Sequence, residues 1–326
     1  MNSHNTFGER FTFTSFGESH GIAVGGVLDG VPAGLKIDMN LIRDELNRRS
    51  GKGQTATSPR ARIEADEVEW LSGVKDGISL GTPIAFILRN TQQKSEDYEV
   101  LKHMLRPGHA DFTYLQKYGI RDYRGGGRAS ARETASRVAA GAIAKQLLIE
   151  RGITIEARLT QVGVETDPER MKRLLEEVTK DGDSIGGIVT CTINGLPAGV
   201  GEPIFDKLQS LLAHAILSIN GCKGFEYGTG FGEMHLRGSE IYHPEQVPCP
   251  RSGGIEGGIS NGLPVVFRCA FKPAATIRQL YGGRHDACIA VRAVPVVEAM
   301  AALTLCDLMN ENQHQNQDES PDENEK

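Results

Sequence analysis

The amino-acid sequence predicts a mixed α+β fold in which helices occupy the centre. Two segments, 132–150 and 295–309, are apolar around most of a helix circumference, which is typical of helices buried on all sides. Short apolar runs bounded by turn residues, at 84–88 and 265–271, predict strands. The chain contains neither GxGxxG nor GxxxxGK[ST], which argues against a dinucleotide-binding Rossmann unit and against a P-loop.

The first elements of the chain return in the same order in its second half. Residues 11–16 alternate in character and predict a strand. A second strand, a Pro/Gly turn and a helix over 40–49 follow, and the same series recurs ahead of a helix over 205–218. The two turns, 29–35 (DGVPAGL) and 194–200 (NGLPAGV), share their glycine and proline positions. We interpret this echo as two related halves rather than as coincidence in a glycine-rich chain.

Composition and charge are those of a soluble globular protein. Hydrophobic residues make up 39% and charged residues 24%, which allows a sizeable core. Residues 311–326 carry six acids and one lysine, and so account for most of the net charge of −6. Because this segment has no apolar period, we predict an acidic disordered tail over 311–326, after a folded region over 1–310.

The cysteine pattern and the hydropathy point to the cytoplasm. The six cysteines are widely spaced, without a CxxC pair or a metal-ligand pattern, and are typical of free thiols in a reducing compartment. The sequence shows neither a secretory signal nor an apolar run long enough to span a bilayer. We therefore expect a cytoplasmic protein without a membrane partner.

The stretch YRGGGRASARETASR, residues 123–137, predicts an anion site at the start of a helix. Ser130 and Glu133 have the spacing of a capping box, and Arg132 then falls in the first turn. A helix N-terminus attracts phosphate, and three glycines together with Arg124 and Arg128 would let backbone and guanidinium groups approach it. The apolar helix that follows disfavours a disordered RGG-type nucleic-acid tail, and by a smaller margin we prefer the anion site to a solvated basic loop.

A second basic cluster, NRRSGKGQTATSPRAR, contains Arg48, Arg49, Lys52, Arg60 and Arg62. Cations favour helix C-termini, so the helix ending near Arg49 accounts for the first two of them. The same loop would also serve as a clamp over a polyanionic substrate, and the residues leave both interpretations open.

Three histidines stand in glycine-containing turns: His20 in GESHGIA, His109 in RPGHADF, and His285 in GGRHDAC beside Asp286. Each alone is more typical of a structural histidine, but together with neighbouring arginines and acids they predict one acid/base site. Because neither HxH nor HExxH spacing occurs, we predict no metal. The residues alone thus indicate a cytosolic enzyme for an anionic, phosphorylated small molecule, and they leave its reaction and cofactor open.

Five long blocks make the sequence similar to the chorismate synthase family. They are FGESHG, RPGHADFTY, DYRGGGRASARET with RVAAGAIAK, SINGCKGFEYG, and GGRHDAC with AVRAVP, and the resemblance runs from about residue 5 to about residue 308. It implies a single catalytic domain with core helices sandwiched between antiparallel sheets in two pseudo-symmetric halves. It also implies a homotetramer that binds reduced FMN. The implied reaction is the anti-1,4-elimination of phosphate and a C6 hydrogen from 5-enolpyruvylshikimate 3-phosphate, without net redox change.

The resemblance also implies residue roles. His20 would protonate the departing phosphate, His109 would stabilise the reduced flavin anion near its N1, and Asp286 would help the flavin N5 accept the substrate proton. The expected substrate-binding residues are Arg49, Arg60, Arg106 and Arg132, and the expected flavin-site residues are Ser130, Ala131, Arg132, Asn220, Gly221, Lys272, Thr276 and Arg284.

Some segments depart from the family pattern. The chain reads CPRSGG around residues 250–252, has a shortened segment over 277–283, and carries Ala287 where proline is usual. The first two are expected near the flavin rim. Two alternatives follow from other classes: an FMN- or phosphate-binding relative that has lost catalysis, and an RNA-binding protein that uses the two basic loops and would bind RNA in a strongly salt-dependent way. Family members differ in using an intrinsic NAD(P)H-dependent flavin reductase or an external reductant, and no motif here decides between them.

Overall fold

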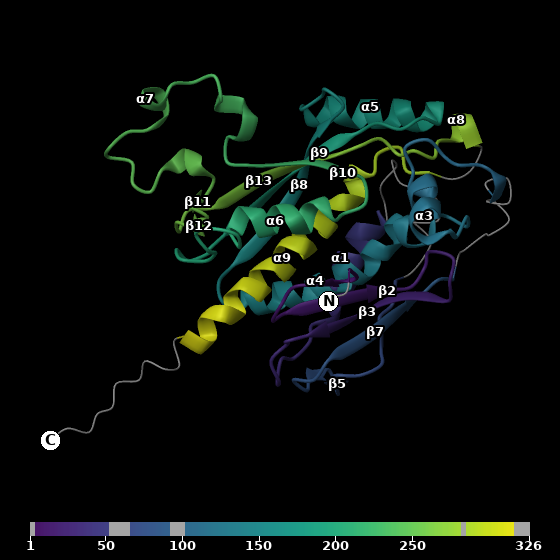
Figure 1. The fold of residues 1–326 in the computed structure, drawn as a ribbon, viewed down its shortest axis with the longest axis horizontal. Helices are drawn as coiled ribbons and strands as arrows, with labels where there is room; N and C mark the ends of the chain where they lie inside the picture. Colours follow the sequence, from purple (N-terminus) through teal and green to yellow (C-terminus); the bar gives the residue numbers. More distant parts are fainter. Residues whose placement is uncertain (1–3, 52–65, 92–101, 282–284, 316–326) are drawn as a thin grey trace.

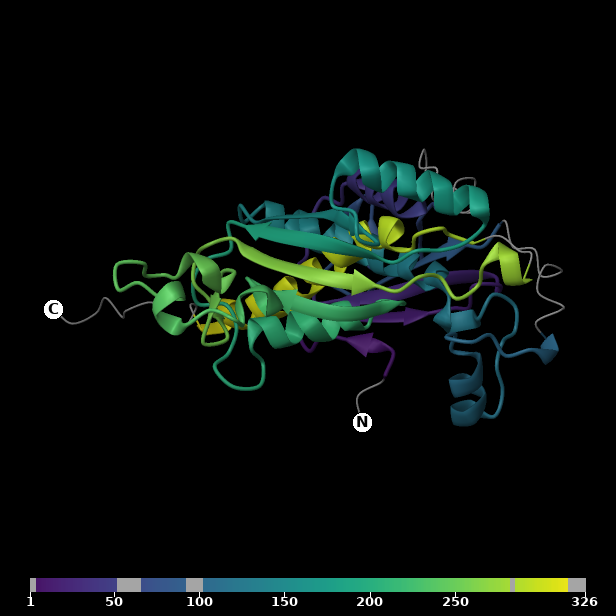
Figure 2. The same cartoon turned by 90° about the horizontal axis from the view of Figure 1, so that it is seen from above.

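Two antiparallel sheets enclose a layer of helices (Figures 1 and 2). The structure, a computed structural model, describes residues 4–51, 66–91, 102–281 and 285–315, with residues 310–315 described in backbone only. In Figure 1 the long helix α9 and the helix α4 run between the sheet that contains β2, β3 and β7 and the sheet that contains β8, β9 and β13. This arrangement confirms the predicted α+β fold with central helices.

The first sheet has the strand order β1-β2-β3-β7-β4, with every neighbouring pair antiparallel. Its strands are β1 (Thr6–Phe7), β2 (Thr12–Phe16), β3 (Ala23–Asp29), β4 (Glu69–Trp70) and β7 (Ile84–Arg89). Alternate residues of β7, namely Ile84, Phe86 and Leu88, are fully buried against the helices, as a two-residue period requires. The strands predicted over 11–16 and 84–88 are confirmed.

The second sheet has the order β10-β13-β9-β8 and is also antiparallel throughout. Its strands are β8 (Thr154–Val162), β9 (Gly187–Asn194), β10 (Cys222–Tyr227) and β13 (Val265–Phe271). The central strand β9 buries Val189, Cys191 and Ile193 on the face that meets the helices. The strand predicted over 265–271 matches β13.

The helix layer consists of α1 (Met39–Ser50), α4 (Thr134–Ile149), α6 (Leu208–Leu217) and α9 (Ala290–Gln315). The helices α4 and α9 approach each other closely because small residues meet at their crossing. A Cβ added to Gly141 would overlap Ala299, so glycine is required there for the two backbones to come together. The predicted alanine-rich core helix is thus a packing device at the centre of the molecule.

The predicted helix bounds are confirmed for α1, α4 and α6 to within a few residues, but α9 begins earlier than expected. The sequence predicted a start at about Pro295, where the apolar segment 295–309 begins. The helix instead begins at Ala290 and carries Pro295 inside it, at the loss of one backbone hydrogen bond. It runs on to Gln315, past the boundary at residue 310 that we expected between the folded region and the tail.

The remaining elements lie outside the three layers. They are the helices α3 (Asp111–Tyr118), α5 (Pro168–Asp181), α7 (Gly238–Ile241) and α8 (Arg278–Tyr281), and the hairpins β5 (Val74–Lys75) with β6 (Ile78–Ser79) and β11 (Ile255–Glu256) with β12 (Ile259–Ser260). Residues 228–254, which connect β10 to β11 and carry α7, form an arm at one end of the long axis in both views. The helices α3 and α8 lie at the other end (Figures 1 and 2).

The two halves share a hydrogen-bond pattern at their repeated turns. The hydroxyl of Ser79, from the β5–β6 hairpin, accepts the backbone N–H of Leu35 at 2.9 Å. The hydroxyl of Ser260, from the β11–β12 hairpin, accepts the N–H of Val200 at the same distance. Each serine N–H in turn donates to the carbonyl of the same partner. These equivalent contacts confirm that the echo in the sequence reflects two related structural units.

Candidate active site

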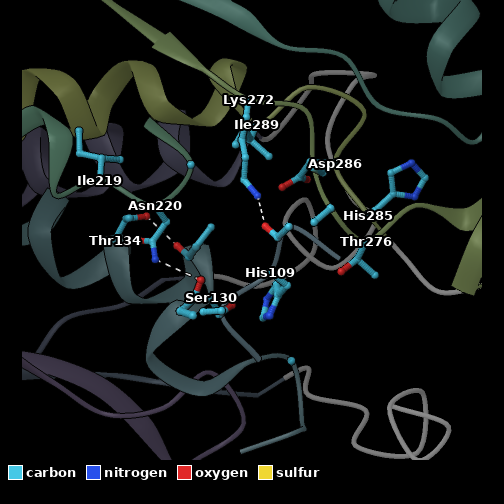
Figure 3. A pocket seen from close by; sticks show the side chains of 18 of the residues that line it. His109, Ser130, Thr134, Ile219, Asn220, Lys272, Thr276, His285, Asp286 and Ile289 are labelled. Atoms are coloured by element: carbon cyan, nitrogen blue, oxygen red, sulfur yellow. Dashed lines mark hydrogen bonds between the residues drawn. The ribbon is translucent and has the colours of Figure 1, made fainter. Parts of the chain in front are cut away.

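A cavity of about 470 Å³ lies where five separate segments of the chain converge. The segments are 106–114, 125–134, 219–221, 272–276 and 285–296. Figure 3 shows the labelled side chains, with His109, Thr276, Lys272 and Asp286 on one side and Ser130, Thr134, Asn220 and Ile219 on the other. The predicted site residues that line the cavity are Arg106, His109, Ser130, Ala131, Asn220, Gly221, Lys272, Thr276 and Asp286.

Three other predicted site residues lie next to the cavity without lining it. His20, Arg49 and Arg132 are not among the residues that line the cavity, although each contacts residues that do or residues next to them in the chain. Arg60 and Arg284 lie outside the described residues, so their predicted roles have no structural counterpart here.

The glycine run at 125–127 brings the two predicted catalytic histidines to one place. All three glycines have positive φ, from 54° to 89°, a conformation that residues with a Cβ rarely adopt. A Cβ added to Gly125 would lie 2.6 Å from Nδ1 of His20, and one added to Gly126 would lie 2.7 Å from Cε1 of His109. The backbone therefore packs directly against both imidazole rings. We expected the glycines to make room for an anion, and in the structure they make room for the rings.

The His20 turn is tied to the N-terminal end of α4 by Asn90. The His20 side chain is buried, with Nδ1 lying 3.1 Å from the hydroxyl of Ser19. The amide of Asn90 donates to the carbonyls of Glu18 and Gly21, on either side of the histidine, while its oxygen accepts from Nε of Arg132 at 2.8 Å. Asn90 is thus a positioning residue that the sequence analysis did not identify.

Arg49 and Arg132 share one carboxylate, that of Asp66. Asp66 pairs with Nη1 of Arg49 at 3.2 Å and, at a shorter distance, with Nη1 of Arg132. The Asp66 side chain is 3% exposed and the arginine side chains 2% and 6%. Their other nitrogens donate to the chain, among other acceptors to the carbonyls of Ala131 and Arg89. Two guanidinium groups therefore face the carboxylate of Asp66 next to the cavity wall.

Arg106 and His109 are held by a second buried acid, Asp111, at the start of α3. Arg106 donates to both carboxylate oxygens of Asp111, at 2.8 and 2.9 Å, and Nδ1 of His109 lies 2.9 Å from one of them. Burial alone would raise the pKa of Asp111, but the hydrogen bonds from Arg106 and His109 outweigh it and hold that pKa well below its usual range. Asp111 therefore stays charged and orients the His109 ring, with its Cε1–Nε2 edge toward Gly126.

The start of α4 is capped only in part as predicted, because Ser130 caps the turn before the helix and no capping box forms. Ser130 accepts the N–H of Arg132 and begins a 3₁₀ turn over Ala131–Glu133 that leads into the helix. Glu133 contacts the Ser15 hydroxyl and Nε of Arg137, so its carboxylate is used elsewhere than in a capping box.

The two arginines predicted to join Arg132 at an anion bind protein groups instead. Arg124 pairs with Asp122, two residues away. Arg128 donates to the carbonyl and hydroxyl of Ser15 and to the carbonyl of Gly17. Arg128 therefore ties the turn before α4 to the N-terminal segment, whereas Arg124 makes a local ion pair within its own loop.

Two groups in the cavity suit a polar, planar ligand. The side-chain oxygen of Asn220 is buried and has no hydrogen-bond partner among the described residues, while its amide donates to the carbonyl of Ala129 at 3.1 Å. Lys272 donates to the carbonyl of Gly108, and burial, with the nearby charge of Lys223, lowers the pKa of its ammonium. Apolar side chains, Ile219 and Ile289 among them, complete the wall.

Three further predictions can be compared with the geometry. His285 lines the cavity, but its Nε2 lies 2.9 Å from the carbonyl of Asp183, which indicates a structural contact. Arg48 pairs with Glu45 and Glu298 on the other side of α1, in agreement with the helix-terminus interpretation. Residues 250–252 do not line this cavity and belong to the segment that carries α7, at the opposite end of the molecule from α3 and α8 (Figures 1 and 2), so their expected place near the flavin rim stays a prediction.

Within the described residues, neither the cysteines nor the hydrophobic helices indicate a second kind of site, such as a metal centre or a membrane span. All six cysteines are free thiols, and burial raises the pKa of Cys306 to about 12. Across the described ranges, no cluster of three or more His, Cys, Asp or Glu residues suits a metal ion. In the same ranges, no helix has the length and apolar character that crossing a bilayer requires.

Comparison with known proteins assigns this chain to a family. The sequence matches the family model for chorismate synthase over residues 11–309. The chain belongs to the chorismate synthase family.

Named relatives agree with this assignment. The chorismate synthase of Phocaeicola vulgatus is 50% identical over 349 residues, which cover 93% of this chain and 97% of that protein. The chorismate synthase of Christiangramia forsetii is 47% identical over 350 residues, with 94% and 98% covered. A crystal structure of chorismate synthase has a TM-score of 0.73 and 30% identity, and covers 94% of this chain and 93% of that one. Since both alignments exceed the 326 residues of this chain, these relatives carry segments that it lacks.

Proposed function

We propose that this protein is a chorismate synthase that converts 5-enolpyruvylshikimate 3-phosphate to chorismate by anti-1,4-elimination of phosphate and the C6 hydrogen, with reduced FMN as cofactor. One observation carries the proposal: the glycine run packs against His20 and His109 beside a cavity that Asp286 also lines. An acid, a base and fixed cations thereby meet at one place, as loss of a phosphate group requires.

The cavity fits a flavin by its own chemistry. The buried, unpaired oxygen of Asn220 is an acceptor that the N–H of an isoalloxazine ring would satisfy, and buried polar atoms need such partners. Lys272 supplies a cation for the cofactor phosphate, and the aliphatic wall suits a flat ring system. When bound, reduced FMN supplies the electron-rich centre at which the elimination proceeds without net redox change.

The residues of this chain would then bind the substrate and move its protons. A departing phosphate is a poor leaving group until its charge is neutralised, so a proton from His20 and the positive charge of Arg49 and Arg132 lower the barrier. These arginines stay charged at every accessible pH. Arg106 holds a further anionic group of the substrate, and Asp286 assists removal of the C6 proton. His109, oriented by Asp111, places a hydrogen-bonding ring beside the cofactor.

An anaerobic assay tests the proposal. Protein, dithionite-reduced FMN and 5-enolpyruvylshikimate 3-phosphate should yield phosphate and chorismate in equal amounts, and oxidised FMN should yield neither. FMN binding without either product would instead favour a catalytically impaired relative. Salt-dependent RNA affinity with no product would favour the nucleic-acid alternative.

Replacement of His20 tests the assigned acid. His20→Ala should lower kcat by roughly 10²–10⁴-fold, as expected for loss of a general acid, while FMN binding measured by fluorescence quenching is preserved. His243→Ala, in the distant arm, is the matched control and should keep wild-type turnover. Unchanged turnover in His20→Ala would remove His20 from this role.

We further propose a cytoplasmic homotetramer. Supporting this, the surface of the described residues exposes large apolar side chains, with Phe205 at 87%, Phe231 at 83% and Val247 at 84%, an exposure that subunit contacts would reduce. Light scattering should give a mass near four chains.

Product formation with NADPH in place of dithionite would identify an intrinsic flavin reductase, and its absence would indicate an external reductant.

A further inference from the structure

Arg292, in the first turn of α9, joins Asp286 to the C-terminal end of α1. Its Nη1 donates to Oδ2 of Asp286 at 2.8 Å, and its Nε donates to the backbone carbonyl of Arg49 at 3.1 Å. The Arg292 side chain is 14% exposed and that of Asp286 11%, and both residues line the cavity. Arg292 thus connects Asp286, six residues before it in the chain, to α1, which is far away in sequence.

The geometry suits a rigid clamp. A guanidinium group is planar and presents its donors in a fixed fork, so two contacts on different nitrogens fix its orientation. The carbonyl of Arg49 belongs to the last turn of α1, where carbonyl groups lack intrahelical donors and attract cations. Arg292 is therefore anchored on α1 by one nitrogen and holds the carboxylate with another.

The anchor point is itself part of the predicted substrate site. The Arg49 side chain donates to the carbonyl of Ala131 at 2.6 Å and pairs with Asp66, which also pairs with Arg132. Arg292 thereby links the carboxylate expected at the flavin with the arginines expected at the substrate. A shift of Asp286 relative to these arginines would misalign the carboxylate expected to assist proton removal with the arginines expected to bind the substrate.

We propose that Arg292 is a positioning residue for Asp286, holding its carboxylate at the orientation that proton removal from the substrate requires. The inference rests on the proposed function, and it assigns Arg292 no contact with the reacting atoms. Two other roles compete with it: direct binding of an anionic substrate group from the cavity wall, and a purely structural tie between α1 and α9.

A double-mutant cycle separates these roles. Arg292→Met removes both contacts while keeping the aliphatic stem, and Asp286→Asn removes the charge of the partner. We expect Arg292→Met to lower kcat by about 10²-fold, the size of effect that follows misplacement of a catalytic group, with KM and the FMN dissociation constant unchanged. The double variant should lose no more activity than Asp286→Asn alone, because both changes disable the same group.

Two further variants serve as a conservative replacement and as a control. Arg292→Lys keeps a cation that reaches only one of the two acceptors, and should show a smaller loss of kcat than Arg292→Met. Arg43→Met, on the exposed face of α1, is the matched control and should keep wild-type activity. If Arg292→Met does not fold, Arg292→Lys carries the comparison.

The contrary results are distinct. A higher KM at unchanged kcat would make Arg292 a substrate ligand, and losses that multiply in the double variant would show that it acts independently of Asp286. A lower melting temperature with wild-type kcat would leave only the structural tie. A crystal structure of Arg292→Met reports independently of turnover: a displaced Asp286 carboxylate supports the inference even if the wild type makes no chorismate, and an unmoved one overturns it.

Discussion

At the scale of single residues, the site depends on places where a side chain is absent. Gly125 and Gly126 combine positive φ with direct contact to an imidazole ring, so a substitution there meets backbone strain and a steric clash together. The sequence indicated the importance of this run, but the rings that require it lie far away in the chain and could not be assigned to it. Because these glycines have no Cβ, both histidine rings can pack against the backbone of this turn.

Gly126→Ala should therefore impair catalysis more than stability. The added methyl group displaces the His109 ring, and a misplaced catalytic group can lower turnover by about 10²-fold. The matched control is Gly152→Ala, where φ is 74° and no atom lies within 4 Å of the added Cβ. Both variants carry the strain of positive φ, of order 1 kcal/mol, and chemical denaturation should show it in both. Equal turnover in the two variants would contradict the account.

Asp111 gives a residue-scale prediction about pH. Because its pKa is lowered in the folded protein, its contribution to stability is present above the ordinary aspartate pKa of about 4 and is lost as pH falls below it. The stability difference between wild type and Asp111→Asn should thus be largest near pH 7 and shrink below about pH 4. Urea unfolding from pH 7 to pH 3 measures it, with Asp44→Asn on the exposed face of α1 as control. A difference that is constant with pH would contradict the charged state of Asp111.

At the scale of elements, the sequence predicted strands and helices where a local period was clear. The strand β7 and the helix α1 follow directly from their apolar patterns. The helix α5 was overlooked although Asp167 caps it, Pro168 opens it and Gly182 ends it, so its signals were present in the sequence. The start of α9 was misplaced because the packing of Ala290 and Ala293 in the core outweighs the local preference of proline for the first turn.

The repeated turns allow a paired test. Ser79 and Ser260 are both buried, and each hydroxyl also donates to a proline carbonyl, that of Pro32 or Pro197, at 2.6 Å. Ser79→Ala and Ser260→Ala should each lower the free energy of unfolding by about 1–3 kcal/mol, since each leaves a buried N–H without its acceptor. The two sites share no partner, so the double variant should show the sum to within about 0.5 kcal/mol. Markedly unequal losses would argue that the halves are not equivalent.

At the scale of the whole molecule, the two sheets and the central helices bring distant segments to one cavity. Residues in the family blocks could be predicted for this site because they stand in motifs. The partners that orient them could not, because Asn90 and Asp66 are single polar residues outside these blocks, and Arg292, although it stands in the AVRAVP block, has a role that depends on its long-range contact with Arg49. Their recognition required the fold, in which α1, α4 and α9 meet behind the cavity.

The central claim is our proposal that the flavin and the phosphate ester bind together, in the cavity that His109 and Asp286 line and next to His20, which packs against Gly125 of its wall. A crystal structure with oxidised FMN and 5-enolpyruvylshikimate 3-phosphate tests it most directly. The account predicts the isoalloxazine ring beside Asn220 and the substrate phosphate on the side of His20 and Arg132. Flavin or substrate bound elsewhere, with this cavity empty, would contradict it.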